Sequence, residues 1–351
     1  MGRADREGDE EGRPGPGVRA GRPAPRPPFR AAGGADEMKA RKASGGAGRE
    51  APPRPLLAAN LSPQLIEILE GSEEPHAAGG EAKTARVQAV KIPSGSSREA
   101  RDREIVLARS LGLTVVLHFW GQPLSVGSES LMDRLDLEDI AGAVRASGTP
   151  SLQSHLFITP EEARGVASPD RQTPRERQAL LDRVTANVAG LMSWLGTGAC
   201  PELSESDLLI ENGVWWGTAV RPTRPGSLRC VVEPDFIREV VESTGCGFLL
   251  DVSHAYIASF YLGLSFEEYI DGLPLGAVRE VHINAPAWVD GVLRDRHLPV
   301  GTDDLRRLRA VLARTRPERV TYEYGTMDPA NAWRSRREDL ERGLGLIAGL
   351  L

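Results

Sequence analysis

Histidine is the residue type whose placement is most informative in this chain of 351 residues, which contains six of them. His76 stands apart, whereas the other five stand at or just beyond the ends of short apolar runs. Imidazole binds metal ions and transfers protons near neutral pH, so histidines that are brought together point to one of these chemistries. The five are His118, His155, His254, His282 and His297.

Carboxylate residues occur at the same places along the chain. Imidazole and carboxylate donors without thiolate suit iron, manganese or zinc, whereas so many nitrogen donors disfavour Mg²⁺. The combined set exceeds what a single octahedral ion can use, so we expect two or three ions bridged by a carboxylate. The carboxylates are Glu211, Asp251, Asp295 and Glu323.

Each candidate ligand also has an ordinary structural explanation. A lone histidine at a strand end is commonly a hydrogen-bonded core residue, and Asp251 could cap the helix that follows it. Glu211 and Glu323 each end an apolar run, where an unpaired buried carboxylate is costly, so each either pairs with Arg or binds a cation. Because all the candidates would need such explanations at once, metal binding is the favoured interpretation.

The elements that position these residues are short runs rich in Leu or β-branched residues, which predict buried strands. Amphipathic segments between them predict helices, for example over residues 99–111, 175–195, 234–243 and 303–313. Eight such repeats in roughly 300 residues fit a closed (β/α)8 TIM barrel, an α/β fold. The predicted strands cover residues 56–61, 86–92, 113–118, 151–158, 207–211, 247–252, 277–283 and 319–324.

A doubly wound open sheet is the alternative α/β fold. It usually carries a G-x-G-x-x-G turn after its first strand, whereas here Ser-Pro-Gln follows Leu61. We therefore expect the barrel, in which the carboxyl ends of all strands meet at one mouth, where active sites of this fold lie. The candidate ligands would then be neighbours in space.

Residues 1–54 differ in composition from the rest of the chain. They are rich in Gly, Pro, Arg and Glu and have almost no large aliphatic residues, so they cannot bury enough apolar surface to offset the entropy of ordering. We predict a disordered N-terminal extension, followed by one metal-binding catalytic domain over residues 55–351.

Removal of residues 1–50 should leave the metal content and the melting temperature nearly unchanged, because a disordered extension makes no contacts that stabilise the barrel. Elemental analysis and thermal unfolding of the truncated chain would check this. A large loss of stability would mean that the segment is docked.

Composition excludes several other classes of protein. The net charge of −6 argues against a protein that holds nucleic acid by neutralising phosphates. The three cysteines lack C-x-x-C spacing, so they indicate neither a disulfide framework nor a thiolate zinc site and favour a reducing compartment. No apolar run approaches the ~18 residues of a membrane span, and no secretion signal is recognisable. We expect a cytoplasmic protein without a nucleic-acid or membrane partner.

Several short motifs occur in a fixed order along the predicted barrel. The most distinctive motif is GCGFLLDVSHAYIASFYLG at 245–263. The others are LHFWGQPLSVGS at 117–128, SHLFI at 154–158, LLIENGVWW at 208–216, EVHINAPAWVDG at 280–291, DRHLP at 295–299 and TYEYG at 321–325. Over roughly residues 55–350, this order resembles the multinuclear non-haem iron-dependent oxidases, the family that includes the methanobactin-biosynthesis oxidase.

The resemblance implies how the candidate residues share the iron ions. Glu211 would bridge two irons, and Glu211, Asp251 and His282 are the implied catalytic residues. The implied sets are His118, His155 and Glu211 for one iron; Glu211, Asp251, His282 and Glu323 for a second; and His254, Asp295 and His297 for a third position.

The resemblance also implies an activity. Members of this family are oxidoreductases that use iron and O2 as co-substrate to modify cysteine residues of ribosomally synthesised precursor peptides, in natural-product biosynthesis. A small partner protein often presents the peptide. The same chemistry would remove a hydrogen from the cysteine β-carbon in this protein.

Two alternatives to the oxidase remain open. A divalent-metal TIM barrel of the sugar-isomerase or endonuclease type also gathers His, Glu and Asp at strand ends, with zinc or manganese and no need for O2. The predicted barrel is poor in lysine, with only Lys83 and Lys91, so a lysine that assists hydride transfer is hard to place. The other alternative is a metal-holding barrel that serves only as a binding subunit.

Overall fold

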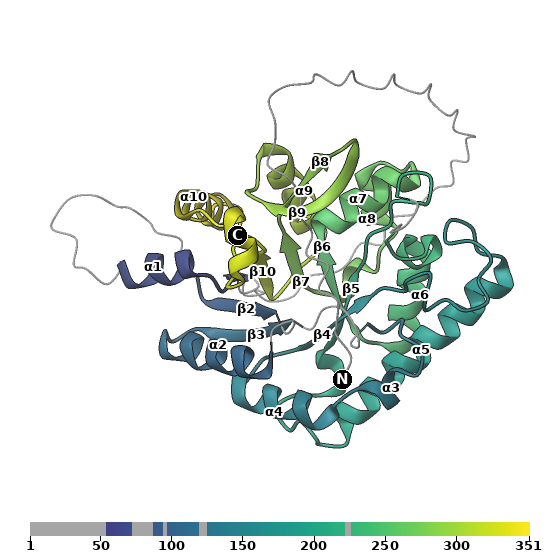
Figure 1. The fold of residues 1–351 in the computed structure, drawn as a ribbon, viewed down its shortest axis with the longest axis horizontal. Helices are drawn as coiled ribbons and strands as arrows, with labels where there is room; N and C mark the ends of the chain where they lie inside the picture. Colours follow the sequence, from purple (N-terminus) through teal and green to yellow (C-terminus); the bar gives the residue numbers. More distant parts are fainter. Residues whose placement is uncertain (1–53, 72–86, 94–96, 119–124, 222–225) are drawn as a thin grey trace, which may run out of the picture. The chain divides into compact units, whose positions relative to one another are not determined.

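The computed structural model describes residues 54–71, 87–93, 97–118, 125–221 and 226–351 (Figure 1). In this part of the chain, parallel strands close into a barrel in the order β1-β10-β7-β6-β5-β4-β3-β2, which confirms the predicted TIM barrel. The predicted extension, residues 1–54, lies outside the described residues except for Arg54, so its disorder stays a prediction. The barrel strands are β1 Leu56–Asn60, β2 Ala89–Pro93, β3 Thr114–His118, β4 Leu152–Leu156, β5 Leu208–Asn212, β6 Gly247–Asp251, β7 Val278–Ile283 and β10 Arg319–Tyr322.

Helices surround the barrel and follow most of its strands (Figure 1). None of the helices in the described ranges is long and apolar enough to cross a membrane. They are α1 Pro63–Gly71, α2 Arg98–Ser110, α3 Leu131–Arg134, α4 Leu137–Ser147, α5 Pro174–Gly196, α6 Pro234–Thr244, α7 Val252–Leu262, α8 Phe266–Asp271, α9 Thr302–Leu312 and α10 Arg337–Ala348. Short 3-10 turns are η1 Glu205–Asp207, η2 Arg229–Val232, η3 Leu275–Ala277 and η4 Pro329–Arg334.

The two faces of the barrel strands have different chemistry. Successive side chains alternate between the faces, and the outward Leu, Ile and Val side chains pack under the helices in one large core. The inward face carries a separate small apolar cluster of Ala58, Ala89 and Val116. Polar side chains occupy much of the remaining interior. Side chains that could bind ions or transfer protons therefore lie on the inner face of the barrel.

A two-stranded antiparallel hairpin between β7 and α9 was not expected from the sequence. It consists of β8 Ala285–Val289 and β9 Val292–Leu298. Asp290 and Gly291 form its two-residue turn, with φ angles of 51° and 74°, as a type I′ turn requires. The Asp-Gly pair between apolar residues is the sequence signal for this turn. The hairpin carries Asp295 and His297, which are therefore not at the end of a barrel strand.

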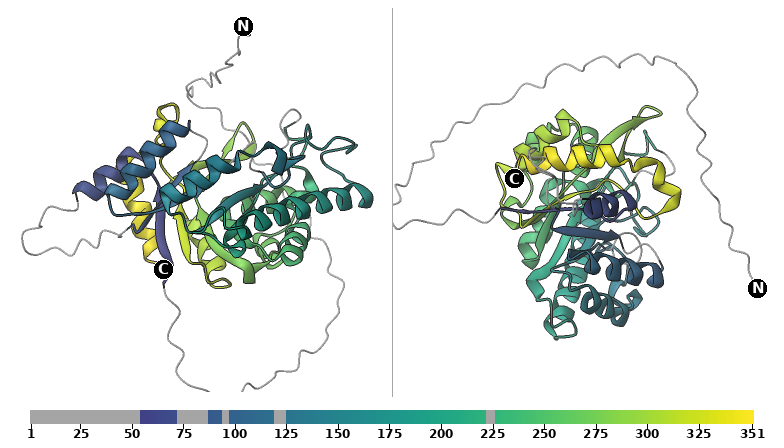
Figure 2. Two further views of the ribbon diagram at one scale, coloured as in Figure 1. Left: turned by 90° about the horizontal axis from the view of Figure 1, so that it is seen from below. Right: turned by 90° about the vertical axis from the view of Figure 1, so that its left-hand side faces the viewer.

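Helices α1 and α10 pack against each other beside β1 and β10, the first and last strands of the barrel (Figures 1 and 2). Gly343 of α10 faces inward, and a Cβ at this position would overlap the ring of Tyr322. Tyr322 is fully buried and stacks on Tyr324. The missing side chain at Gly343 is therefore what lets α10 approach β10.

Gly343→Ala should lower the free energy of unfolding by about 1–3 kcal/mol, because the buried Tyr322 ring must move to admit the methyl group. Gly345→Ala is the matched control, since Gly345 is exposed in the same helix and its Cβ would meet nothing within 4 Å. The control should gain about 0.5–1 kcal/mol from helix propensity. Thermal unfolding of both variants checks the pair; equal melting temperatures would contradict the packing argument.

Candidate metal centre

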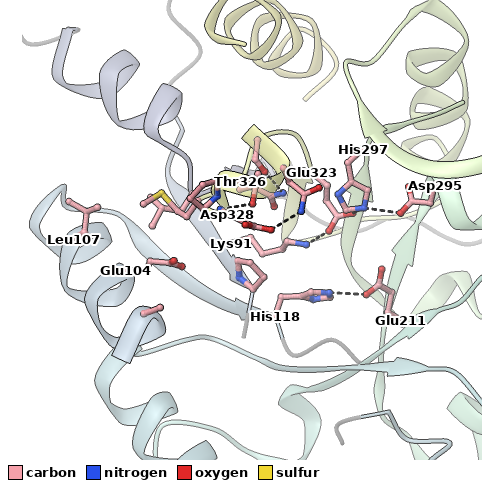
Figure 3. Close-up of a pocket in the computed structure, with 18 of the residues that line it drawn as sticks. Lys91, Glu104, Leu107, His118, Glu211, Asp295, His297, Glu323, Thr326 and Asp328 are labelled. Atoms are coloured by element: carbon pink, nitrogen blue, oxygen red, sulfur yellow. Dashed lines mark hydrogen bonds and ion pairs between the residues drawn. The ribbon is translucent and has the colours of Figure 1, made fainter. Parts of the chain in front are cut away.

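The register of the barrel strands brings the candidate ligands to one level at the carboxyl end of the barrel. His155 of β4 lies opposite Glu211 of β5, and Asp251 of β6 lies opposite His282 of β7. His118 ends β3, and Glu323 directly follows β10. A parallel sheet closed in this way turns candidate ligands that are far apart in the sequence into a ring, and His118, Glu211 and Glu323 of this ring line one cavity (Figure 3).

Glu211 is at the centre of this ring. One of its oxygens, Oε2, lies 3.1 Å from Nε2 of His155 and 3.3 Å from Nε2 of His118. The other, Oε1, lies 3.7 Å from Nδ1 of His282. Two groups of three place one ligand atom from each residue within 4.8 Å of one another: His118, His155 and Glu211, and Glu211, Asp251 and His282. Glu211 belongs to both groups, as a bridging ligand would.

The remaining predicted ligands extend the ring on the hairpin side. Oδ2 of Asp295 lies 2.8 Å from Nε2 of His297 and 3.5 Å from Nε2 of His254. Glu323 connects this set to the barrel, because its Oε1 lies 3.1 Å from Nδ1 of His282 and its Oε2 lies 3.7 Å from Nε2 of His297. The structure therefore brings all the predicted site residues together.

His297 has a strained backbone conformation. Its φ is 48°, in the left-handed region that side chains with a Cβ rarely adopt. Such strain is concentrated at functional sites, where surrounding contacts hold the residue in place. The imidazole of His297 contacts Asp295 of the same strand, β9 (Figure 3).

Asp251 combines a structural and a chemical role. Its Oδ1 accepts a hydrogen bond of 2.6 Å from the backbone N–H of His254 and so caps α7, as the sequence allowed. Its Oδ2 is buried without a hydrogen bond among the described residues. Asn212 fixes the strand end, because its amide donates to the carbonyl of Asp251 and accepts from its N–H. The helix cap therefore leaves one carboxylate oxygen for a ligand.

Unsatisfied buried atoms test whether this ring suits a metal ion. Buried polar atoms are nearly always hydrogen-bonded, so several orphans in one place need an explanation. Within the described residues, four ring atoms are buried without a hydrogen bond: Oε2 of Glu211, Oδ2 of Asp251, Nδ1 of His282 and Oδ1 of Asp295. All are lone-pair donors, and a cation would satisfy them together. The residues present therefore fit metal ions, and imidazole with carboxylate suits iron, manganese or zinc.

The pKa values of two ring carboxylates shift in opposite directions. Burial raises the pKa of Asp251 to about 7, and the charges of Glu323 and Glu211 act in the same direction. Burial also works against ionised Glu211, but His155 and His118 outweigh it and hold the pKa of Glu211 well below its usual range. Asp251 thus has less compensating positive charge than Glu211, and a bound cation would favour its ionised form.

A buried polar network below the ring orients two of the imidazoles. Oε1 of Glu280 lies 3.2 Å from Nε2 of His282, which leaves Nδ1 facing the ring. Oε1 of Gln153 lies 2.7 Å from Nδ1 of His118, and the Gln153 amide donates to Glu280. Arg319 donates to Glu280 through Nε and Nη2, at 3.0 and 2.9 Å. Hydrogen bonds of this kind fix the ring orientation of metal-ligating histidines.

Glu280, Gln153 and Arg319 were not foreseen from the sequence, although a signal for them exists. Glu280 precedes His282 by two residues, and Gln153 precedes His155 by two, so the period of a strand places each pair on the same inward face. Burial disfavours an ionised Glu280, but Arg319 and His282 outweigh this effect and hold the pKa of Glu280 at about 2.

Lys91 was the other residue not foreseen as part of the site. It lies on β2 with its side chain 4% exposed, lines the same cavity and forms an ion pair with Oε1 of Glu323 (Figure 3). The sequence made a lysine that could assist hydride transfer hard to place, and the structure now places Lys91 in this cavity. Strand alternation explains this, because Lys91 and Ala89 face inward. Glu323 thus has a basic partner, a lysine rather than an arginine.

The ring opens into a cavity of ≈ 990 Å³. On its far side lie Glu104 and Leu107 of α2, and the segment leading into η4 contributes Met327 and Asp328 (Figure 3). Glu104 is buried, its side chain has no ion pair or hydrogen bond among the described residues, and burial raises its pKa. The cavity is large enough to admit several side chains.

Solved structures with a similar arrangement share the fold at low sequence identity. A xylose isomerase domain containing protein from Salmonella typhimurium LT2 matches with a TM-score of 0.52 and 11% identity, over 86% of this chain and 99% of that chain. A D-tagatose 3-epimerase-like protein matches with a TM-score of 0.50 and 15% identity, over 84% of this chain and 98% of that chain. At these identities the likeness shows the TIM barrel alone.

Relatives in sequence carry the name UPF0276 protein. The protein from Caulobacter sp. (strain K31) is 31% identical over 120 residues, which are 34% of this chain and 38% of that protein. The protein from Streptomyces avermitilis is 29% identical over 246 residues, which are 68% of this chain and 45% of that protein. The matched segments thus span less than half the length of these relatives.

A family model covers more of the chain. The model described as RiPP precursor modification enzyme MbnB/TglH/ChrH matches residues 94–330, which include all the predicted ligands. This agrees with the family that the ordered motifs resemble. The chain belongs to the MbnB/TglH/ChrH family of RiPP precursor modification enzymes.

Proposed function

We propose that this protein is a non-haem iron oxidase that uses O2 to modify a cysteine residue of a ribosomally synthesised precursor peptide. The observation that carries the proposal is the position of Glu211, one buried carboxylate shared by two groups of potential ligands. A shared carboxylate is the simplest way to hold two ions close enough to act on one substrate. The family match supports a precursor peptide as the substrate.

Bound iron would supply one-electron chemistry with O2 and a site for the substrate thiolate. His118, His155 and Glu211 would hold one ion, and Glu211, Asp251 and His282 the next. Glu280 and Gln153 keep the imidazoles of His282 and His118 turned toward the ions. The chain's part in the reaction is to leave open coordination positions and to keep bulk water away.

The cavity accounts for how a peptide would reach the ring. His118, His155 and Glu211 line it, whereas Asp251 and His282 are fully buried behind them. A cysteine side chain that enters between α2 and the segment before η4 would therefore meet the first group of ligands directly. A small partner protein that presents the peptide belongs to the proposal, as does a cytoplasmic location.

The test is elemental analysis of protein purified without oxygen from iron-supplemented cells, with Mössbauer spectra before and after exposure to air. The proposal predicts about two or three irons per chain and a signal that O2 changes. Incubation with a cysteine-containing precursor peptide encoded beside the gene should change the peptide mass only when O2 is present. Stoichiometric zinc or manganese with no response to O2 would overturn the iron assignment.

Lys91 favours a second candidate function, the isomerisation of sugars. A lysine beside bound metal ions is what a sugar isomerase would need to assist hydride transfer, and Lys91 lines the cavity. The same preparation, loaded with Mn²⁺ and offered a series of aldoses and ketoses, tests this candidate. Isomerisation without O2 would favour it over the oxidase, whereas no sugar conversion would exclude it.

A further inference from the structure

We infer that the cavity contains a subsite apart from the ligand ring, in which Glu104 binds the positively charged side chain of a lysine or arginine near the cysteine of the peptide. The inference rests on the proposed function in one respect, that a cysteine-containing peptide enters this cavity. It goes beyond that function because it names a feature of the peptide that the protein selects. Glu104 is thus a specificity-determining residue.

One face of helix α2 forms the wall of the cavity that carries this subsite. The cavity-lining residues of α2 are Ala100, Arg103, Glu104 and Leu107, whose spacing of three or four residues places them on the same side of the helix. Figure 3 shows Glu104 across the cavity from Glu211 and Asp295. A group bound to Glu104 would therefore lie apart from the ring, in the same cavity.

Glu104 has no direct counter-charge in the described ranges. Its residue is 9% exposed, and its side chain forms neither an ion pair nor a hydrogen bond there. Burial raises the pKa of Glu104 and outweighs the charge of Arg103, which is exposed and does not pair with it. Carboxylates that are buried to this extent are normally paired with a cation. Glu104 is therefore suited to a positive charge that comes from outside the chain.

A second acceptor without a donor lines the same cavity. Asn60 ends β1 and is 8% exposed, and its amide donates to the carbonyl of Gly325 over 3.1 Å. Its Oδ1 is buried without a hydrogen bond in the part of the chain that the structure describes. Lysine and arginine side chains have several donors and no acceptor. Two unmatched acceptors thus favour a ligand that donates, and the carboxylate of Glu104 favours one that is also charged.

Asp328, the other acidic residue on this side of the cavity, is already engaged within the chain. Its Oδ1 accepts a hydrogen bond of 2.9 Å from the backbone N–H of Ala330, and its Oδ2 accepts one of 2.7 Å from the amide of Asn331. Both oxygens therefore stabilise the start of η4. Asp328 is also exposed, so water screens its charge more than that of Glu104.

The apolar lining of the cavity suits the rest of a long basic side chain. Leu61, Leu107 and Met327 line it, together with Pro93 and Pro329. Lysine and arginine bury their aliphatic stems against apolar surface while the charged end contacts a polar group. An apolar wall with one carboxylate accordingly fits such a side chain better than it fits a short polar one.

Peptide binding to the full chain tests the subsite, with protein purified from iron-supplemented cells and kept without oxygen. The probes are synthetic nonapeptides of Ala and Gly with a central Cys, acetylated and amidated so that their termini carry no charge. One of the other positions in turn would carry Lys, Arg, norleucine, Gln or Glu. Isothermal titration calorimetry would give the dissociation constants, and the Lys and Arg peptides distinguish the two cations.

We expect Lys or Arg to tighten binding by about tenfold or more over norleucine at one position, because the distance from Glu104 to the ring is fixed. Glu104→Gln should lose this preference, since it keeps the shape of the side chain without the charge. Glu104→Lys should instead prefer the Glu peptide. Glu99→Gln is the matched control, because Glu99 is exposed at the start of the same helix, and it should keep the preference.

Equal affinity for the Lys, Arg and norleucine peptides would overturn the inference, as would a preference that persists in Glu104→Gln. Tighter binding of Gln than of Lys would mean that Glu104 selects a neutral donor, and it would overturn the inference too. So would the absence of binding by every peptide up to about 1 mM. Circular dichroism checks folding; Glu104→Gln removes an uncompensated charge and should fold, so it decides even if Glu104→Lys does not.

Admission of O2 to the bound peptides separates this inference from the proposed function. A preference for basic peptides without oxidation of their cysteine would leave the subsite standing and contradict the oxidase. Oxidation of all the peptides without a preference for charge would support the oxidase and overturn the subsite.

Discussion

Glu211→Gln should lose both bound metal and turnover while it keeps its fold. The substitution preserves volume but removes the only charge shared by the two ligand groups. Loss of a residue that merely orients a ligand lowers metal affinity by 10–100-fold, so loss of a bridging ligand should exceed about 100-fold. Elemental analysis and a peptide-oxidation assay would measure the two effects.

A matched control separates this effect from any loss of surface charge. Glu202 is exposed, and Glu202→Gln should leave the metal content and turnover unchanged. The far-ultraviolet circular dichroism of Glu211→Gln should match that of the wild type, because the hydrogen bonds of the strand backbone remain. Full metal content in Glu211→Gln would contradict its assignment as the bridging residue.

Arg319→Met should strongly lower the stability of the barrel, because it leaves a buried carboxylate without its main counter-charge. Arg319 is 2% exposed, and its guanidinium donates to Glu280 and, over 3.0 Å, to Oγ of Ser151. Removal of one partner from a buried ion pair costs about 3–5 kcal/mol, because the other charge is left without compensation. In a domain of this size that corresponds to a fall in melting temperature of roughly 5–15 °C.

The control is an arginine in an exposed ion pair. Nη2 of Arg342 lies 2.8 Å from Oδ1 of Asp339 within α10, and its side chain is 62% exposed. Exposed pairs contribute about 0–1 kcal/mol, so Arg342→Met should leave the melting temperature nearly unchanged. Differential scanning calorimetry of the metal-free proteins compares the two. If both variants lower the melting temperature by a similar, small amount, the buried carboxylate of Glu280 does not need the charge of Arg319.

The barrel could be predicted from the sequence, because alternation of apolar runs with amphipathic segments is a local property of the chain. The strands predicted over residues 207–211 and 247–252 overlap β5 and β6 with ends that differ by one residue, and the helix predicted over residues 234–243 is α6 with one further residue. The strand predicted over residues 86–92 corresponds to β2. Within the described residues, β2 begins at Ala89, three residues after the predicted start. Patterns identify elements well and their ends less well.

The cluster of candidate ligands could also be predicted from the sequence. Polar residues at the ends of apolar strands are conspicuous, and the closure of a parallel barrel requires those ends to meet. His118, Glu211 and Asp251 could therefore be placed together without knowledge of a single distance. Whether they bind iron stays a prediction that elemental analysis will decide.

The partners of these residues, in contrast, became apparent only from the three-dimensional arrangement. The pairing of Lys91 with Glu323 joins β2 to the end of β10, and that of Glu280 with Arg319 joins β7 to β10. The hairpin that carries Asp295 and His297 reaches the barrel mouth from outside the sheet. Residue types and local periods determine which side chains face inward, but contacts across the barrel depend on register and side-chain packing, which no single segment specifies.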